Sequence, residues 1–208
     1  MIRAMISDFG GVLTAPLVEG FLAYQRESGV SMEDLGRAMA AAAAEHGEHP
    51  LYALERGEIS EAEFRHRLEA QLDGAFHLER FRDVYFDRLA PNRPMIDFMG
   101  ELRGRGLRMA LCTNNVREWE PLWRAKLPEI DEVFEVVVDS AFVGMRKPEP
   151  AIYELTLERL GGVAAADCVF LDDLDVNCAA AELLGMHAVR FETNEQAIAD
   201  VEAALERR

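Results

Sequence analysis

The chain has 208 residues, with 38 Asp and Glu against 22 Lys and Arg, which gives a formal net charge of −16 at pH 7. This acidic balance argues against nucleic-acid binding and against docking on an anionic membrane, because both use clusters of Lys and Arg. Hydrophobic residues make up 50% and charged residues 29%, a composition typical of a soluble globular protein. The length allows one sizeable core, or a core and a small second domain.

The first apolar run of the chain is too short for a signal peptide, and no run approaches the length of a membrane span. The cysteines, Cys112, Cys168 and Cys178, are odd in number and far apart, and no Cys-x-x-Cys pair occurs. We therefore expect small buried thiols in a cytoplasmic protein, and neither disulfides nor a zinc site.

Five short apolar runs are typical of β-strands, and the first four are nearly continuous, as expected of parallel strands covered on both faces. The runs are residues 5–7, 109–112, 136–138, 168–171 and 188–191. Helical patterns separate the later runs. They are residues 94–102, a segment with Trp119 and Trp123 on one face, residues 150–160 before Gly161, and residues 175–184 before Gly185. Strands that alternate with helices predict an open α/β sheet.

Between about residue 15 and residue 90 the chain has no strand pattern. Ser31 and Ser60 are candidate helix N-caps, and Glu63 has the spacing to complete a capping box with Ser60. Two apolar stripes with helical spacing follow. They are Phe64, Leu68 and Leu72, and then Leu78, Phe81, Tyr85 and Leu89. The segment is predicted to be a helical bundle inserted after the first strand.

Polar side chains follow four of the predicted strands, where ligands bind in open α/β sheets. They are Asp8 with Gly10 and Gly11, Thr113 with Asn114, Asp139 followed by Lys147, and Asp172 with Asp173. Clustered carboxylates need a cation, and Mg²⁺ binds carboxylates, waters and phosphate oxygens. One carboxylate beside the metal can act as a nucleophile toward phosphorus, while a hydroxyl and an ammonium hold the phosphoryl oxygens.

Together these segments resemble the four motifs of the haloacid dehalogenase superfamily of hydrolases, in the order of that family. The matching residues are 6–14, 112–114, 147–148 and 171–177. Residues 54–60 and 144–150 are similar to a narrower group that includes glucose-1-phosphatase-like proteins and the N-terminal phosphatase domain of soluble epoxide hydrolase. The resemblance implies a Rossmann-like, doubly wound parallel sheet (residues 1–15 and 90–208) with an inserted helical C1-type cap domain (residues 16–89).

The resemblance also implies roles for individual residues. Asp8 would be the nucleophile and a Mg²⁺ ligand, together with the carbonyl of Gly10 and with Asp173, while Asp172 would ligate or orient the site. The phosphoryl group would be bound by Thr113, Asn114 and Lys147 and by the backbone at Gly10 and Gly11. The substrate would be a small phosphorylated metabolite, with a sugar phosphate as one candidate.

One position departs from the pattern of the family. Most family phosphatases carry a second Asp two residues after the nucleophile, as an acid and base, and here that residue is Gly10. The cap residues His46, Glu48 and His49 are candidate substitutes. The departure leaves two other functions open, a non-catalytic or slow phospho-ligand-binding protein and a metal-free, dehalogenase-type hydrolase that attacks carbon. The oligomeric state, monomer or homodimer, is also open.

Overall fold

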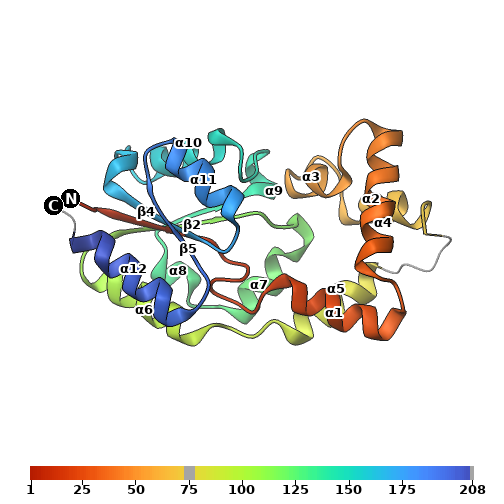
Figure 1. The fold of residues 1–208 in the computed structure, drawn as a ribbon, viewed down its shortest axis with the longest axis horizontal. Helices are drawn as coiled ribbons and strands as arrows, with labels where there is room; N and C mark the ends of the chain where they lie inside the picture. The colour runs from red at the N-terminus through yellow and green to blue at the C-terminus, as the bar shows by residue number, and fades with distance from the viewer. Residues whose placement is uncertain (73–77, 207–208) are drawn as a thin grey trace.

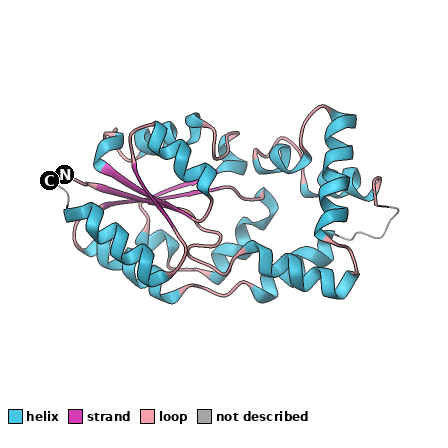
Figure 2. Cartoon of the chain, in the orientation of Figure 1, coloured by secondary structure: helices cyan, strands magenta, loops and turns pink. Residues whose placement is uncertain are grey.

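A computed structural model describes residues 1–72 and 78–206 of the chain. Its centre is one sheet of five parallel strands (Figure 2). The strands are β1 (Ala4–Ser7), β2 (Arg108–Thr113), β3 (Val136–Asp139), β4 (Cys168–Asp172) and β5 (His187–Arg190). Their spatial order is β3-β2-β1-β4-β5. The predicted α/β class is therefore confirmed, and each predicted strand lies within a residue or two of its observed position.

The central strands are mostly apolar because each one contributes side chains to two cores. On β1, Met5 packs into the cluster on one face of the sheet, whereas Ala4 and Ile6 pack into the cluster on the other face. On β4, Val169 and Phe170 divide in the same way. A strand that is buried on both faces cannot alternate apolar with polar residues, which explains the nearly continuous hydrophobic runs.

Helices cover both faces of the sheet (Figure 1). On one side lie α6 (Arg93–Gly104), α8 (Ile130–Val133) and α12 (Asn194–Glu206), and on the other side lie α10 (Pro150–Arg159) and α11 (Asp175–Leu183). The shorter elements are η1 (Arg117–Trp119), α7 (Glu120–Lys126), α9 (Ser140–Val143) and η2 (Ala165–Asp167). The predicted helix through Trp119 and Trp123 is thus two elements, since a new helix begins at Glu120 with Pro121 in its first turn.

Among the described residues, five helices lie between β1 and α6, on the side of the sheet where the strands end (Figure 1). They are α1 (Leu17–Ser28), α2 (Met32–His46), α3 (Pro50–Glu55), α4 (Glu61–Glu69) and α5 (Leu78–Arg88). The chain enters and leaves this bundle through two segments that pair with each other. The Ala15 N–H donates to the Ala90 carbonyl at 2.9 Å, and the Asn92 N–H donates to the Leu13 carbonyl at 2.9 Å.

The two predicted N-caps differ in how they are completed. The Ser31 hydroxyl accepts from the Asp34 N–H at 3.1 Å, and Asp34 accepts in return from the Ser31 N–H at 3.1 Å, which is a full capping box. The Ser60 hydroxyl accepts from the Glu63 N–H at 3.1 Å, but the predicted return bond from Glu63 is absent. Glu63 instead accepts from Arg67 Nε at 2.8 Å, because a guanidinium one turn away is a stronger partner.

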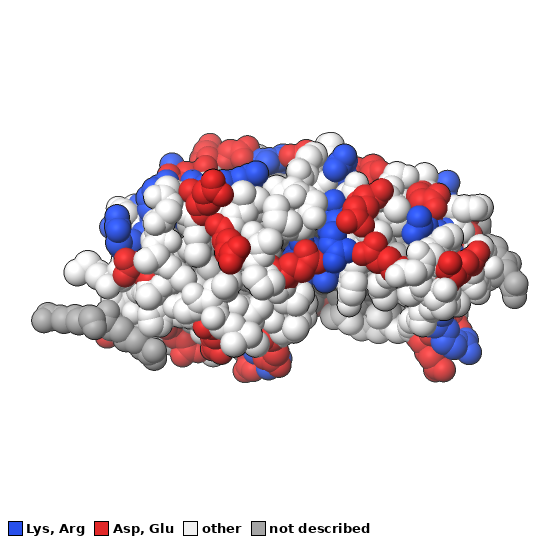
Figure 3. Space-filling view, turned by 90° about the horizontal axis from the view of Figure 1, so that it is seen from above, with Lys and Arg blue, Asp and Glu red and all other residues white. Residues whose placement is uncertain are grey.

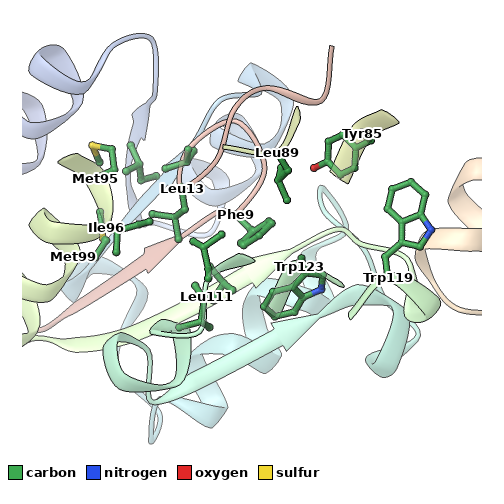
Figure 4. Close-up of a cluster of buried hydrophobic side chains, with 14 of the residues drawn as sticks. Phe9, Leu13, Tyr85, Leu89, Met95, Ile96, Met99, Leu111, Trp119 and Trp123 are labelled. Carbon is green, nitrogen blue, oxygen red and sulfur yellow. The ribbon is translucent and has the colours of Figure 1, made fainter. Parts of the chain in front are cut away.

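The apolar core extends from beneath the sheet into the helical bundle (Figure 4). Phe9 and Trp123 have ring centroids 5.1 Å apart, and Tyr85 stacks on Trp119 at 5.7 Å. The residues of the predicted stripes pack into this core, with the side chain of Leu78 outside the part that the structure describes. They are Phe64, Leu68, Phe81, Tyr85 and Leu89, with Leu72 at the margin. All three cysteines are free thiols and buried, as predicted.

Most of the charged residues lie outside these cores. Figure 3 shows acidic and basic side chains interspersed over one long face of the molecule. Within residues 1–72 and 78–206, no helix is both long enough and apolar enough to cross a membrane.

Asp139 is a buried exception at the end of β3. Its Oδ1 accepts from the Ala141 N–H at 3.0 Å, while Oδ2 has no partner among the described residues. Burial, followed by the nearby Glu120 carboxylate, raises the pKa of Asp139 from 3.8 to about 6. The folded state therefore keeps a proton that the unfolded chain releases, so stability falls as the pH rises from about 4 to about 6.

We expect Asp139→Asn to remove the fall in stability with rising pH, because an amide does not ionise. Relative to the wild type, the free energy of unfolding of the variant should rise by about 1–3 kcal/mol between pH 4 and pH 7, as measured by urea denaturation. Asp97→Asn, at an exposed position on α6, is the control and should show no such trend. If the stability difference between Asp139→Asn and the wild type also stays constant with pH, the raised pKa of Asp139 is contradicted.

Candidate active site

The parallel register of the sheet brings the predicted site residues to one edge. Ser7, the last residue of β1, is level with Leu111 on β2 and with Leu171 on β4. The N–H of the next residue, Asp8, donates to the Leu171 carbonyl at 2.8 Å. The residues that follow the three central strands therefore meet, as expected from the carboxyl-end rule for open sheets.

Lys147 is an almost fully buried charged group of the site, with 1% of its surface exposed. Its Nζ lies 2.7 Å from Asp8 Oδ1 and 2.6 Å from Asp172 Oδ2. Burial alone would lower the pKa of this ammonium, but the Asp172 and Asp8 carboxylates outweigh that effect and hold the pKa above its ordinary value. Lys147 is therefore a fixed cation beside the predicted nucleophile.

Asp172 is committed to holding other groups of the site in place. Its Oδ1 accepts from the Leu174 N–H at 2.9 Å and from Asn177 Nδ2 at 2.9 Å, and its Oδ2 binds Lys147. Because both oxygens are occupied, Asp172 fits the orienting role that we predicted for it as an alternative to direct metal ligation.

Asn114 lies beside Lys147, but its side chain faces the backbone of that residue. Asn114 Nδ2 donates to the Lys147 carbonyl at 2.9 Å, and the Lys147 N–H donates to Asn114 Oδ1 at 2.8 Å. Both polar atoms of the amide are thus used to position Lys147. A contact from Asn114 to a phosphoryl group is left to its main-chain N–H, while the hydroxyl of the neighbouring Thr113 remains a candidate donor.

Asp8, Asp172 and Asp173 form an acidic cluster in which one oxygen of each lies within 4.8 Å of the others. Burial raises the pKa of Asp8 to about 7, with Lys147 opposing the shift and Asp172 adding to it. Burial and then Asp172 also raise the pKa of Asp173. Carboxylates in this state gain from a cation between them, and hard oxygen ligands suit Mg²⁺, so the donor set fits that metal.

Gly11 makes room for the third carboxylate. A Cβ on Gly11 would lie 2.5 Å from Asp173 Oδ2, and the backbone of Gly11 has a φ of +79°, a region that side chains disfavour. At Gly10, by contrast, a Cβ would meet no atom within 4 Å. The first glycine after Phe9 leaves an open space, and the second permits a close approach.

A cavity of about 150 Å³ opens beside these residues, between the strand ends and the inserted helices. From the strand ends it is lined by Phe9, Gly10, Thr113, Asn114, Asn115, Val116 and Trp119. From the inserted helices it is lined by Phe21, Leu35, Met39, Leu51, Leu54, Glu55, Phe64, Leu68, Phe81 and Tyr85. Most of the lining is therefore apolar.

The polar cap residues that we considered as substitutes for the missing Asp are not part of this lining. Glu48 pairs with Arg56, and His49 stacks on Tyr52 with ring centroids 4.5 Å apart; His46 lies at the exposed end of α2. The carboxylate that does line the cavity is Glu55, near the end of α3. The spacing of apolar residues in the sequence did not indicate that Glu55 lines a cavity, because Glu55 belongs to none of the apolar stripes.

Ion pairs connect α3 to the segment that carries Lys147. Glu55 Oε2 accepts from Arg146 Nε at 2.6 Å, and Arg56 binds Glu149 with its Nε at 3.0 Å. The Arg146 guanidinium also lies over the ring of Tyr52, 4.0 Å from its centroid. These contacts bring the inserted helices against the loop between α9 and α10.

Comparisons with known proteins agree with this arrangement. The family model of the haloacid dehalogenase-like hydrolases matches residues 2–185. A sesquiterpene phosphatase, astK, from Aspergillus oryzae is 30% identical over 195 residues, which cover 88% of this chain and 87% of the relative. The chain belongs to the haloacid dehalogenase-like hydrolases.

Two further similarities are to a larger protein and to a solved structure of lower sequence identity. Rat bifunctional epoxide hydrolase 2 is 26% identical over 97% of this chain, but the match spans only 38% of that protein. Among solved structures, a family enzyme from Bacteroides thetaiotaomicron, in complex with magnesium and inorganic phosphate, superposes with a TM-score of 0.69. It is 22% identical, and the match covers 92% of this chain and 95% of that one. The similarity shows that the fold is shared.

The two glycines after Phe9 provide a test of the geometry. We expect Gly11→Ala to lower the free energy of unfolding by about 1–3 kcal/mol, because its Cβ would displace Asp173 and strain the backbone. Gly10→Ala, which meets open space, should change it by less than about 1 kcal/mol. Urea denaturation of both variants measures the difference, and equal losses would show that the approach of Asp173 is not the constraint.

Proposed function

We propose that the protein is a Mg²⁺-dependent phosphomonoester hydrolase that acts on a small phosphorylated metabolite through an aspartyl-phosphate on Asp8. The observation that carries this proposal is the fixed Lys147 ammonium between Asp8 and Asp172, with Asp173 completing an acidic cluster. The similarity to a sesquiterpene phosphatase and to a family enzyme in complex with magnesium and phosphate supports it.

In the proposed reaction Asp8 attacks phosphorus and the P–O bond to the alcohol breaks. The leaving oxygen takes a proton from solvent, because residue 10 has no acidic side chain. Water then hydrolyses the acyl phosphate to inorganic phosphate and returns that proton to the solvent. Lys147 orients Asp8 and balances the phosphoryl charge, while Thr113 and the main-chain N–H groups of residues 10, 11 and 114 bind phosphoryl oxygens. Asp8, Asp173 and the Gly10 carbonyl would hold Mg²⁺. The metal supplies further neutralisation of the phosphoryl charge.

The inserted helices serve in this proposal as a cap domain, residues 16–89, over a core of residues 1–15 and 90–208. The paired segments at Ala15 and Ala90 lie at the proposed boundary. The cavity lies between the two parts, which is where a cap would enclose the organic part of a substrate.

Two other functions are weaker. The missing side chain at Gly10 favours slow turnover or phospho-ligand binding without turnover, and this is the principal alternative. A carbon-centred, metal-free hydrolase is disfavoured because such a site has no need for Asp173 beside Asp8, where burial and Asp172 raise the pKa of Asp173.

Removal of the nucleophile is the direct test. We expect Asp8→Asn to lose phosphate release by about a thousandfold or more, as measured on a panel of phosphate esters with Mg²⁺ and with EDTA in its place. The wild type should lose activity when the metal is chelated. Asp175→Asn, whose carboxylate is 76% exposed, is the matched control and should keep the wild-type rate. Equal activity of Asp8→Asn and the wild type would refute the role of Asp8.

The open space at Gly10 allows the missing acid to be restored. We expect Gly10→Asp to raise kcat by about tenfold or more on alkyl phosphates, whose leaving oxygen needs a proton. The gain should be smaller on p-nitrophenyl phosphate, whose leaving group needs none. Gly10→Asn has nearly the same shape without the acid, so an equal gain from Asn would exclude an acid–base explanation.

A further inference from the structure

The cavity beside the acidic cluster has a polar end and an apolar end. Its polar groups other than Glu55 and the Tyr85 hydroxyl come from the strand ends and the segment that follows β2. They are the backbone of Gly10, the side chains of Thr113, Asn114 and Asn115, and the indole N–H of Trp119, which has no partner among the described residues. The inserted helices contribute leucines, phenylalanines and a methionine from α1, α2, α3, α4 and α5. A phosphate ester that binds at the strand ends therefore extends its organic part among apolar side chains.

We infer that the substrate is a phosphate monoester of an apolar alcohol, with an alkyl, prenyl or aryl group of about six carbons in this cavity. The inference rests on the proposed phosphatase function and specifies its substrate class. The reaction consumes one water and breaks one P–O bond, and its products are the apolar alcohol and inorganic phosphate.

The lining offers few partners to a polyhydroxylated ligand. Within the part of the inserted helices that the structure describes, the one carboxylate of the lining is Glu55, which already accepts from Arg146 at 2.6 Å. Sugar hydroxyls enclosed here would lose water without finding enough replacement hydrogen bonds, which carries a free-energy cost for each group. An apolar group behaves in the opposite way, because every methylene that is removed from water makes the free energy of binding more favourable. The cavity thus disfavours the sugar phosphate that the sequence suggested as a candidate.

The size of the cavity sets the expected size of the group. Its volume is about 150 Å³, and an apolar protein cavity of about that volume accommodates benzene. The lining side chains Phe21, Met39 and Leu51 are only partly buried although they pack against the core, so apolar surface remains available to a ligand.

A chain-length series tests the inference. For n-alkyl phosphates from methyl to dodecyl, kcat/KM should rise about fourfold for each added methylene, the factor that corresponds to about 0.8 kcal/mol per buried CH₂. The rise should level off beyond about six carbons, when the cavity is full. Glucose 1-phosphate and glucose 6-phosphate should be at least about tenfold poorer substrates than hexyl phosphate.

Two methionines of α2 provide matched variants. Met39 lines the cavity, whereas Met32 at the start of the same helix is 44% exposed and lies outside the lining. We expect Met39→Gln to lower kcat/KM for hexyl phosphate by about tenfold and to leave methyl phosphate nearly unchanged. Met32→Gln should change neither. Urea denaturation of both variants checks that they are folded.

The outcomes separate this inference from the proposed function. Hydrolysis of sugar phosphates without dependence on alkyl chain length would overturn the inference and leave the phosphatase function intact. If no ester is hydrolysed, including p-nitrophenyl phosphate, the proposed function fails. Calorimetric titration with alkylphosphonates, which cannot be hydrolysed, then decides the inference. Affinity that increases with chain length up to about six carbons supports it, and affinity independent of chain length overturns it.

Discussion

The pairing of the Lys147 ammonium with two carboxylates is the interaction on which the proposed site depends. Asp8 and Asp172 are both buried, and buried carboxylates without a cation would protonate or destabilise the fold. Lys147 lies within 2.7 Å of each of them, and its position is set from two sides, by the Asn114 amide on its backbone and by the Asp172 carboxylate on its ammonium. The burial of these charges is tolerated because every one of them is paired.

The same parallel sheet that organises these charges also determines how the two ends of the cavity differ. Strand ends carry polar residues because they leave the apolar layers between the helices and the sheet. The inserted helices have no such constraint and place apolar faces over the strand ends. These faces are continuous with the core, because Phe81 stacks on Tyr85 and Tyr85 stacks on Trp119 (Figure 4). Polarity therefore changes over a short distance, from the acidic cluster to the apolar lining.

Much of the fold could be predicted from the sequence, because buried parallel strands have continuous hydrophobicity and the polar residues after them must meet at one edge. The proximity of Asp8, Lys147 and Asp172 could be predicted in this way. The role of the Asn114 side chain could not be predicted, because it binds the backbone of Lys147, which only the folded chain brings close. The residues that line the cavity could not be identified either. An apolar stripe such as Phe64 and Leu68 predicts burial, but it does not distinguish the core from a cavity wall, and Glu55 belongs to no such stripe. The prediction of a capping box at Ser60 was wrong, because Arg67 competes for the Glu63 carboxylate.

The ion pairs between α3 and the loop before α10 have a consequence for how a ligand enters and leaves. Glu55 binds Arg146, the residue next to Lys147, and Arg56 binds Glu149, two residues beyond it. A displacement of α3 that widens the cavity must break these pairs and so loosens the loop that carries Lys147. Movement of α3 away from the loop and the position of Lys147 beside Asp8 are therefore coupled through these ion pairs.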